Sequence, residues 1–346
     1  MKTTQKDIRA LSKDQLREFF IAQGDQAFRG NQVYEWLWTK GAHSFEEMTN
    51  LSKETRAHLE KHFVINHIEV DTLQKSNDGT IKNAVKLHDG LVVESVLIPT
   101  EKRTTACVSS QVGCSLDCAF CATARLKRMR NLLPDEIYDQ VVAIDRESRL
   151  YYDHPLSNIV FMGMGEPLMN YKNVLAAIDK ITDEEGLGMS PKRITVSTSG
   201  VPKMIKKLAD DEVKFHLAVS LHSAIQETRE DIMPFAKNFT LTDLKEALEY
   251  WYEKTKRRIT YEYVVWKDIN DKKEDIDALI RFCSYVPCKV NIIEYNPIDD
   301  GKFQQAPDKA VTEYINALEK HHIPVTVRRS RGKDIDAACG QLANKH

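Results

Sequence analysis

Three cysteines on one short segment are the feature of this sequence most suited to chemistry. Cys114, Cys118 and Cys121 form a C-x3-C-x2-C pattern. Three thiolates on one loop can converge on one metal centre, and ligation by thiolates alone suits zinc or an iron–sulfur cluster. A structural zinc site needs a fourth ligand, and no second C-x2-C or H-x3-H pair lies nearby. Three cysteines on a four-iron cluster leave one iron open for a substrate. We therefore expect a [4Fe-4S] cluster, with zinc or three unrelated thiols as the alternatives.

The other cysteines are scattered along the chain. The 346 residues include seven cysteines, an odd number that indicates metal or thiol chemistry rather than a set of structural disulfides. Cys339 follows a basic run in a loop of small residues, and nearby cations favour the nucleophilic thiolate. Cys107 lies just upstream of the cluster segment, whereas Cys283 and Cys288 are expected to be inert buried residues.

Charge and hydropathy limit the class of protein. The 49 Lys and Arg against 51 Asp and Glu give a formal net charge of -2, which excludes a uniformly basic nucleic-acid coat and an acidic disordered tail. No apolar run reaches the roughly 18 residues of a membrane span, and the chain start lacks the apolar core of a secretory signal. We therefore expect a cytoplasmic protein with no membrane partner. Three basic runs, at 125–130, 254–258 and 328–333, are candidate phosphate contacts, although such runs are usually solvated faces.

The first part of the chain predicts a small helical domain. Residues 1–63 have helical periodicity. Ser12 with Gln15, and Ser44 with Glu47, fit capping boxes that would begin two helices.

The pattern then changes to strands and to alternating strands and helices. Residues 64–102 predict a β-hairpin region, with turn pairs at Asp78-Gly79 and Asp89-Gly90. From residue 103 to 346, short β-branched runs alternate with amphipathic helices, which indicates an α/β domain with a parallel sheet. The expected strands are 104–109, 158–162, 193–197, 214–220, 258–265, 289–294 and 324–329. Six or seven units fall short of a closed eight-stranded barrel, so we expect a partial, open barrel, with a doubly wound sheet as the alternative.

Six segments, in order, carry a family resemblance. They are QVGC at 111–114, GMGEPL at 163–168, RITVSTSG at 193–200, LAVSLH at 217–222, PCKVN at 287–291 leading to NP at 296–297, and DIDAACGQL at 334–342. Together with the cysteine segment they resemble the radical S-adenosylmethionine (SAM) superfamily and, within it, the RlmN/Cfr RNA adenine methyltransferases, most closely the RlmN type. The resemblance spans about residues 90–343. It implies domains at 1–63 (RNA-binding accessory), 64–102 (linking strands) and 103–346 (catalytic).

The resemblance implies a SAM site on the rim of the barrel. The residues it assigns to SAM are Gly165, Glu166, Ser197, Ser220, Leu221, His222 and Asn296. They fall at or just beyond the carboxyl ends of predicted strands, where α/β barrels build their active sites. Glycines there would let backbone approach the ligand closely, and the polar side chains would contact it.

The resemblance also implies a two-cysteine mechanism. One SAM methylates Cys339, and a second SAM on the cluster is cleaved to a 5′-deoxyadenosyl radical that removes hydrogen from the S-methyl group. The methylene radical adds to C2 of adenine, Glu94 accepts the proton, and Cys107 attacks Cys339 to release the base. The resulting disulfide requires a thiol reductant, and SAM cleavage requires a one-electron donor such as a flavodoxin.

The family implies 23S rRNA of the peptidyl transferase centre and the tRNA anticodon loop, position 37, as substrates. A Cfr-type C8 methyltransferase shares these motifs and is the nearest alternative; a non-enzymatic iron–sulfur or zinc RNA-binding protein is a third. Two segments depart from the family pattern: at 124–132 we expect the loop and RNA contacts to differ, and at 223–226 the rim beside SAM.

Overall fold

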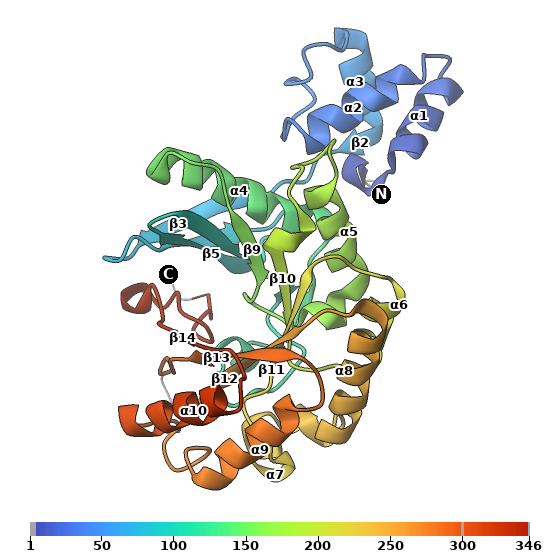
Figure 1. Ribbon diagram of the computed structural model, residues 1–346. Helices are drawn as coiled ribbons and strands as arrows, with labels where there is room; N and C mark the ends of the chain where they lie inside the picture. The colour runs from blue at the N-terminus through green and yellow to red at the C-terminus, as the bar shows by residue number, and fades with distance from the viewer. Residues whose placement is uncertain (1–4, 299–300, 345–346) are drawn as a thin grey trace.

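A single sheet of ten strands forms the body of the molecule (Figure 1). The structure is a computed structural model that describes residues 5–298 and 301–344. The spatial order of the strands is β14-β13-β12-β11-β10-β9-β6-β5-β4-β3. The parallel strands are β6 (Arg103–Cys107), β9 (Asn158–Phe161), β10 (Ile194–Thr198), β11 (His216–Ser220), β12 (Ile259–Val264), β13 (Cys288–Ile293) and β14 (Val325–Arg328). All seven predicted strands are present, each within two residues of its expected ends.

The strand order settles the architecture. The parallel strands follow one another in chain order, without the reversal that creates the switch point of a doubly wound sheet. The connecting helices are α4 (Pro134–Tyr152), α5 (Tyr171–Thr182), α6 (Pro202–Asp210), α7 (Gln226–Ile232), α8 (Leu241–Thr255), α9 (Lys273–Cys283) and α10 (Asp308–Lys320). Among the described strands the sheet does not close on itself, because β14 and β3 are its two edges. The prediction of an open, partial β/α barrel is confirmed.

The linking strands continue the barrel sheet. β3 (Glu69–Lys75), β4 (Ile81–Lys86) and β5 (Val92–Thr100) form an antiparallel meander, and β5 pairs with β6 through Val96 and Cys107. The two predicted turns are present, with Gly79 at φ +88° and Gly90 at φ +82°. Residues on β5 therefore lie beside the first strand of the parallel series.

The amino-terminal region is a separate helical lobe at the upper right of Figure 1. It contains α1 (Lys13–Ala22), α2 (Phe28–Trp38) and α3 (Lys53–His62), closed by the short parallel pair β1 (Lys6–Asp7) and β2 (Phe63–Val64). The predicted capping box at Ser12 and Gln15 is present, with Gln15 N donating to Ser12 Oγ at 3.1 Å and Ser12 N to Gln15 Oε1 at 2.9 Å.

The second predicted capping box is wrong. Ser44 Oγ does donate to Glu47 Oε1 at 3.2 Å, but no helix begins there. The chain instead turns so that Phe45, Met48 and Leu51 are all buried in the lobe. Burial of these three side chains outweighs the local signal for a helix, and the next helix, α3, begins only at Lys53.

A buried ion cluster joins the lobe to the barrel. Arg9 Nη1 donates to Asp139 Oδ1 at 2.8 Å and Arg9 Nη2 to Asp135 Oδ2 at 3.1 Å, with 4% of the arginine side chain exposed. Tyr138 adds a hydrogen bond to the carbonyl of Trp38. α4 is therefore the platform on which the helical lobe sits.

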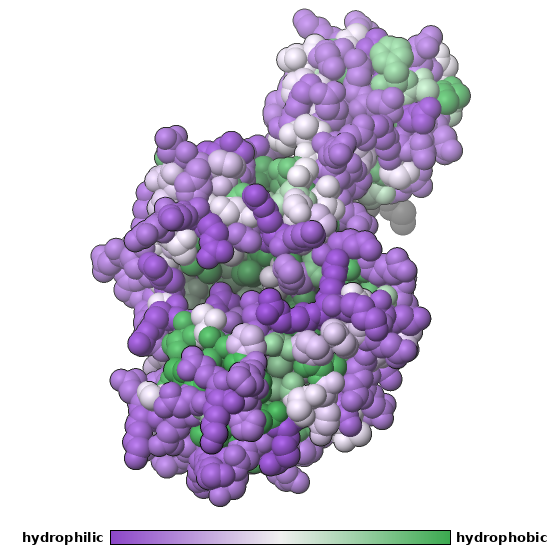
Figure 2. All heavy atoms as spheres, in the orientation of Figure 1, coloured by the Kyte–Doolittle hydropathy of each residue, from purple (hydrophilic) through white to green (hydrophobic). Residues whose placement is uncertain are grey.

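Most of the visible surface is hydrophilic, and green apolar residues show mainly in the hollow across the middle of the body (Figure 2). No helix among the described residues is long and apolar enough to cross a membrane.

Candidate active site

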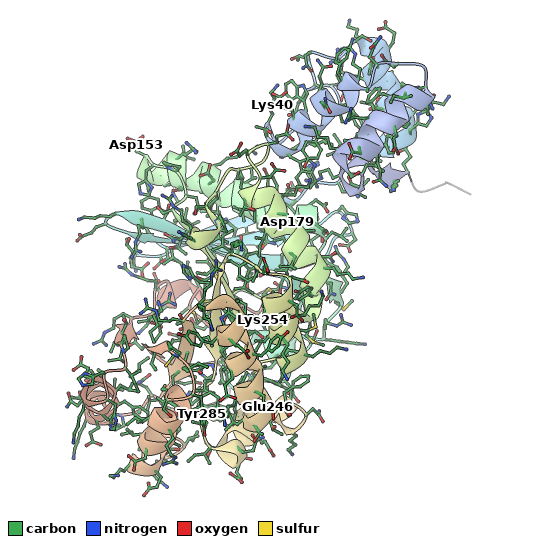
Figure 3. All side chains as sticks on the ribbon, turned by 45° about the vertical axis from the view of Figure 1, so that its right-hand side comes forward. Lys40, Asp153, Asp179, Glu246, Lys254 and Tyr285 are labelled. Carbon is green, nitrogen blue, oxygen red and sulfur yellow. The ribbon has the colours of Figure 1, made fainter. Side chains whose placement is uncertain are left out.

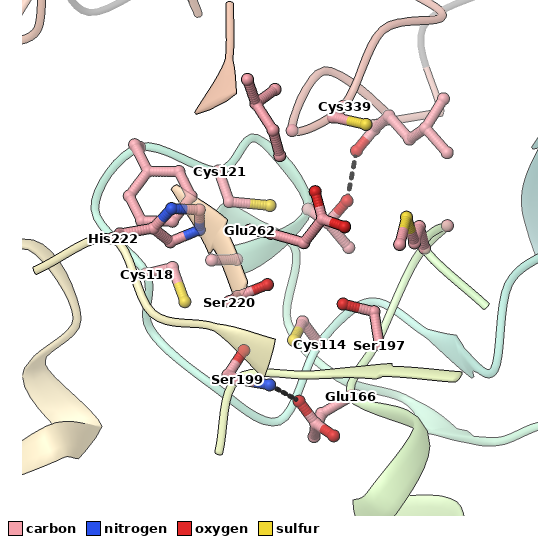
Figure 4. Close-up of a pocket in the computed structure, with 18 of the residues that line it drawn as sticks. Cys114, Cys118, Cys121, Glu166, Ser197, Ser199, Ser220, His222, Glu262 and Cys339 are labelled. Carbon is pink, nitrogen blue, oxygen red and sulfur yellow. Dashed lines mark hydrogen bonds between the residues drawn. The ribbon is translucent and has the colours of Figure 1, made fainter. Parts of the chain in front are cut away.

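One pocket gathers most of the predicted site residues at the carboxyl ends of the parallel strands (Figure 4). Those that line it are Cys114, Cys118, Cys121, Gly165, Glu166, Ser197, Ser220, His222, Asn296 and Cys339. The other three predicted residues, Glu94, Cys107 and Leu221, are buried and do not line the pocket.

The cysteine loop leaves the sheet after β7 (Gln111–Val112), which pairs with β8 (Arg130–Asn131). Gln111 is fully buried and supports the loop: its Nε2 donates to Ser115 Oγ at 2.7 Å and its Oε1 accepts from Ser115 N at 3.2 Å. The carboxylate of Asp117 accepts from Phe235 N at 3.0 Å. These contacts place the loop across the mouth of the pocket.

The three cluster-loop thiols lie close enough together to influence one another. Burial raises the pKa of Cys114 to about 12 and that of Cys118 well above its usual value, and the neighbouring thiols add to both shifts. A cationic metal centre would compensate by stabilising the thiolates. No three Cys, His, Asp or Glu side chains among the described residues are close enough to hold one metal ion. Tetrahedral zinc would need sulfurs about 3.8 Å apart, whereas a four-iron cluster takes each cysteine on a different iron.

The rim glycines have a packing role besides the expected approach to a ligand. A Cβ on Gly165 would lie 2.5 Å from Cβ of Gln111, and one on Gly163 would lie 2.7 Å from Oγ of Ser109. Gly165 also has φ +94°. The absence of a side chain at these positions is required by packing of the rim loop on the segment that leads to the cluster, in addition to any approach of a ligand.

Glu166 joins two strand ends. Its Oε1 accepts from Leu168 N at 3.0 Å and its Oε2 from Ser199 N at 2.8 Å. Burial raises its pKa, and these hydrogen bonds oppose the shift. A carboxylate has further lone pairs, so Glu166 can still accept from a ligand amine.

Two polar atoms on the pocket wall lack partners. Oδ1 of Asn296 and Oε2 of Glu262 are buried and accept no hydrogen bond from any residue that the structure describes. Ser197 and Ser220 line the same wall at the ends of β10 and β11. Since buried polar atoms are normally satisfied, this wall is suited to a polar ligand such as SAM.

His222 and Leu221 have mainly structural contacts. Burial lowers the pKa of His222 to about 3, so the ring is neutral at pH 7, and its Nδ1 accepts from Val264 N at 3.2 Å. Its ring packs edge-on against Phe120 with centroids 4.9 Å apart. Leu221 is fully buried, and its N–H donates to Glu262 O at 3.0 Å. The carbonyl of Leu221 accepts from Ser223 N and Arg229 Nε, so its backbone contacts lie within the protein.

Cys339 faces the pocket from the carboxyl-terminal segment. Cys339 keeps solvent-accessible surface, but the protein atoms around its thiol desolvate it and raise its pKa. Arg328 opposes this shift and Glu262 adds to it. Arg328 favours the thiolate, as expected of a neighbouring cation, but desolvation outweighs it and sets the net direction of the pKa shift. The single nearby cation on β14 does not compensate for desolvation.

Cys107, the last residue of β6, lies near Cys339. It is 6% exposed, and burial raises its pKa to about 12, with Cys339 as the next contribution. The fold thus brings two thiols that are more than two hundred residues apart in sequence close enough to interact electrostatically. Cys283 at the end of α9 and Cys288 at the start of β13 are both buried, as expected.

Glu94 is placed away from the pocket. It is fully buried on β5, its Oε1 lies 3.2 Å from Nζ of Lys82, and its Oε2 accepts from Ala343 N and Asn344 N. A group that is to accept a proton from a base in the pocket must first become accessible to it.

The basic runs differ in position. Arg130 is held by Asp89 and Glu136, whereas Lys127 and Arg128 are exposed beside the cluster loop. Lys254 lies on α8, before the start of β12 and so at the end of the barrel opposite the pocket (Figure 3). In the third run, Arg328 and Lys333 pair with the pocket residues Glu262 and Glu294. The first and third runs thus border the site.

Sequence reasoning missed Glu262. It lines the pocket, is 2% exposed, and its Oε1 accepts from Asn291 Nδ2 at 2.8 Å. An acidic residue within the apolar run of β12 was the available signal.

Comparisons with known proteins agree with this geometry. The family model described as "Ribosomal RNA large subunit methyltransferase N-terminal domain" matches residues 6–65, and the radical SAM superfamily model matches residues 108–283. A probable dual-specificity RNA methyltransferase RlmN from Flavobacterium johnsoniae is 77% identical over 100% of this chain and 99% of its own length. The RlmN of Geotalea uraniireducens is 42% identical over 98% of this chain and 97% of its own. The crystal structure of a radical SAM methyltransferase from Sphaerobacter thermophilus superposes with a TM-score of 0.92 at 36% identity, covering 98% of this chain and 100% of that one.

Proposed function

The chain belongs to the RlmN family of radical SAM RNA methyltransferases, and from that premise we propose that it methylates C2 of adenine in 23S rRNA and in tRNA at position 37. The observation that carries the proposal is the position of Cys339. Its exposed thiol lines the same pocket as the three cluster cysteines, with the thiol of Cys107 coupled to it from β6.

The cluster and SAM would occupy the pocket lined by the three cysteines and the rim residues. When bound, the cluster supplies the electron that cleaves SAM to methionine and a 5′-deoxyadenosyl radical, and it can take one electron back. Cys114, Cys118 and Cys121 would hold it. Glu166, Ser197, Ser220 and Asn296 would position SAM, and the neutral ring of His222 with Phe120 would form the apolar side of its site.

Cys339 would carry the methyl group. Its sulfur loses the thiol proton and attacks the methyl carbon of a first SAM, and S-adenosylhomocysteine leaves as the C–S bond of the sulfonium breaks. After hydrogen abstraction, its methylene carbon adds to C2, a position too electron-poor to attack SAM directly. The adduct loses one electron and the C2 proton, for which Glu94 is the proposed acceptor. Cys107, as thiolate, then forms a disulfide with Cys339 while the S–C bond breaks, and the carbon takes a proton to complete the methyl group. A flavodoxin-like electron donor and a thiol reductant complete the cycle.

Two cysteine variants test the proposal. Cys107→Ala should accumulate a covalent protein–RNA adduct, because the S–C bond is no longer broken. Cys339→Ala should give neither adduct nor methylated RNA. Denaturing gels with labelled 23S rRNA fragments and tRNA, followed by mass spectrometry of the nucleosides, measure both. Free methylated RNA from either variant contradicts the mechanism.

The position of the new methyl group separates C2 from C8. Mass spectrometry of nucleosides from a deletion strain should show loss of 2-methyladenine. Loss of 8-methyladenine would instead assign the Cfr-type reaction.

A further inference from the structure

The segment that carries Cys339 is attached to β5 by one carboxylate. Ala343 N and Asn344 N both donate to Oε2 of Glu94, at 2.8 Å and 3.0 Å. Asn344 Nδ2 also donates to the carbonyl of Val92 at 2.9 Å. These are contacts between residues about 250 positions apart in sequence, and they are made by the fourth and fifth residues after Cys339.

The carboxylate is itself held in place. Glu94 is 0% and Lys82 3% exposed at the side chain, and their charged atoms are 3.2 Å apart. A buried charge of either sign is costly without its partner, so the pair can persist only as a unit. Backbone N–H groups that donate to a carboxylate form strong, short hydrogen bonds.

The other side of the segment is attached to the cluster loop and the rim. Thr123 Oγ1 donates to Leu342 O at 2.6 Å, and Ala122 N donates to Gly340 O at 2.7 Å. Asn296 Nδ2 lies 3.3 Å from the carbonyl of Cys339. The segment that carries Cys339 is thus hydrogen-bonded to the cluster loop on one side and to Glu94 on the other.

We propose that Glu94 and Lys82 are positioning residues that latch the segment 338–344, so that the Cys339 thiol faces the SAM pocket. This inference rests on the proposed function for its chemistry. It adds a task for Glu94 before any proton transfer from adenine: the latched carboxylate is turned to Ala343 and Asn344, so it can accept a proton from RNA only after the segment is released. Latching serves methylation of Cys339, and release serves the later step.

The half-reaction without RNA separates the two tasks of Glu94. Methyl transfer from SAM to Cys339 involves no adenine, so a residue that only accepts the C2 proton does not affect it. We compare a variant that removes the latch, Glu94→Leu with Lys82→Met, with a matched one that keeps an acceptor oxygen, Glu94→Gln with Lys82→Met. The measurements on the full chain are hydrogen–deuterium exchange of residues 338–344 and the rate of the +14 Da shift on the Cys339 peptide at several SAM concentrations.

The latch predicts a split result. The Leu/Met variant should exchange faster in 338–344 and transfer methyl about 10- to 100-fold more slowly, with an unchanged KM for SAM because the pocket residues are untouched. The Gln/Met variant should stay within about threefold of the wild type. Wild-type exchange and wild-type methyl transfer in the Leu/Met variant overturn the proposal, as does an equal defect in both variants.

A second route leaves Glu94 and Lys82 intact in case the double variants do not fold. Ala343→Pro removes one of the two donated N–H groups and should likewise speed exchange and slow methyl transfer. Asn344→Gly keeps the left-handed backbone at φ +54° and removes only the bond to Val92, so its effect should be smaller. If Ala343→Pro matches the wild type, the latch is wrong. If the wild type itself methylates no Cys339, the proposed function fails, while the exchange data still decide the latch.

Discussion

The two sides of the pocket are built in opposite ways. On one side, three thiols lie within eight residues; Gln111 supports their loop locally through Ser115, and Phe235 N, 118 positions away, donates to Asp117. On the other side, the exposed thiol of Cys339 depends on Thr123, Asn296 and Glu94, contacts that span 43 to 249 positions. The comparison teaches that the three cysteines are brought together by their spacing on one loop, whereas the position of Cys339 exists only when β5, the cluster loop and the segment 338–344 are assembled.

The largest expected effect distinguishes the two sides by chemistry. Cys118→Ala should abolish both 5′-deoxyadenosine formation and methylated RNA, by about 1,000-fold or more, because a cluster ligand is lost. Cys339→Ala should keep the visible absorbance of the cluster and still cleave SAM. Absorbance after anaerobic reconstitution and chromatographic assay of 5′-deoxyadenosine measure this, with Cys283→Ala as the bystander control. Equal loss of SAM cleavage in both variants would remove the distinction.

On the side of the three cysteines, a packing clash should lower the stability of the protein. Gly165→Ala places a Cβ 2.5 Å from Gln111 at φ +94° and should lower the free energy of unfolding by about 3 kcal/mol. Gly90→Ala, at φ +82° with no atom within 4 Å of the added Cβ, tests backbone strain alone and should cost about 1 kcal/mol. Urea unfolding monitored by fluorescence compares them. Equal losses of unfolding free energy in the two variants would show that Gln111 moves to accommodate the added methyl group.

Thr123→Val tests the connection between the sides. It removes the 2.6 Å hydrogen bond to Leu342 O while keeping the side-chain volume. The free energy of unfolding should fall by about 1 kcal/mol. Because the segment loosens, iodoacetamide should alkylate Cys339 faster. Peptide mass spectrometry gives the alkylation rate. No change in either quantity would mean that the cluster loop does not restrain the segment.

The smallest effect concerns the reactivity of Cys339. The negative charge of Glu262 raises the pKa of this thiol, so Glu262→Gln should lower it and increase the thiolate fraction at a given pH. Alkylation between pH 7 and 9 should therefore be faster, by about threefold, and the curve should shift to lower pH. Arg328→Gln should shift it to higher pH. Shifts in the opposite directions would show that rearrangement, not charge, controls the thiol.

Much of the fold could be predicted because it depends on periodicity. The strand and helix repeats predicted the parallel sheet, and the unbroken series predicted an open barrel, as found. The capping box at Ser12 formed, but the one at Ser44 did not begin a helix, because burial of Phe45, Met48 and Leu51 decided the local conformation. Local signals hold where tertiary packing does not oppose them.

The sequence by itself identified the candidate residues for chemistry: Cys114, Cys118 and Cys121 by their spacing, the polar residues at the strand ends, and Cys339. Side-chain type and short-range spacing are enough for that. Only the tertiary structure decided that Glu94 is bonded to the chain end, that Glu262 faces the pocket, and that desolvation raises the pKa of Cys339 despite Arg328. Burial and long-range contacts set these properties, and neither is encoded in the neighbours along the chain.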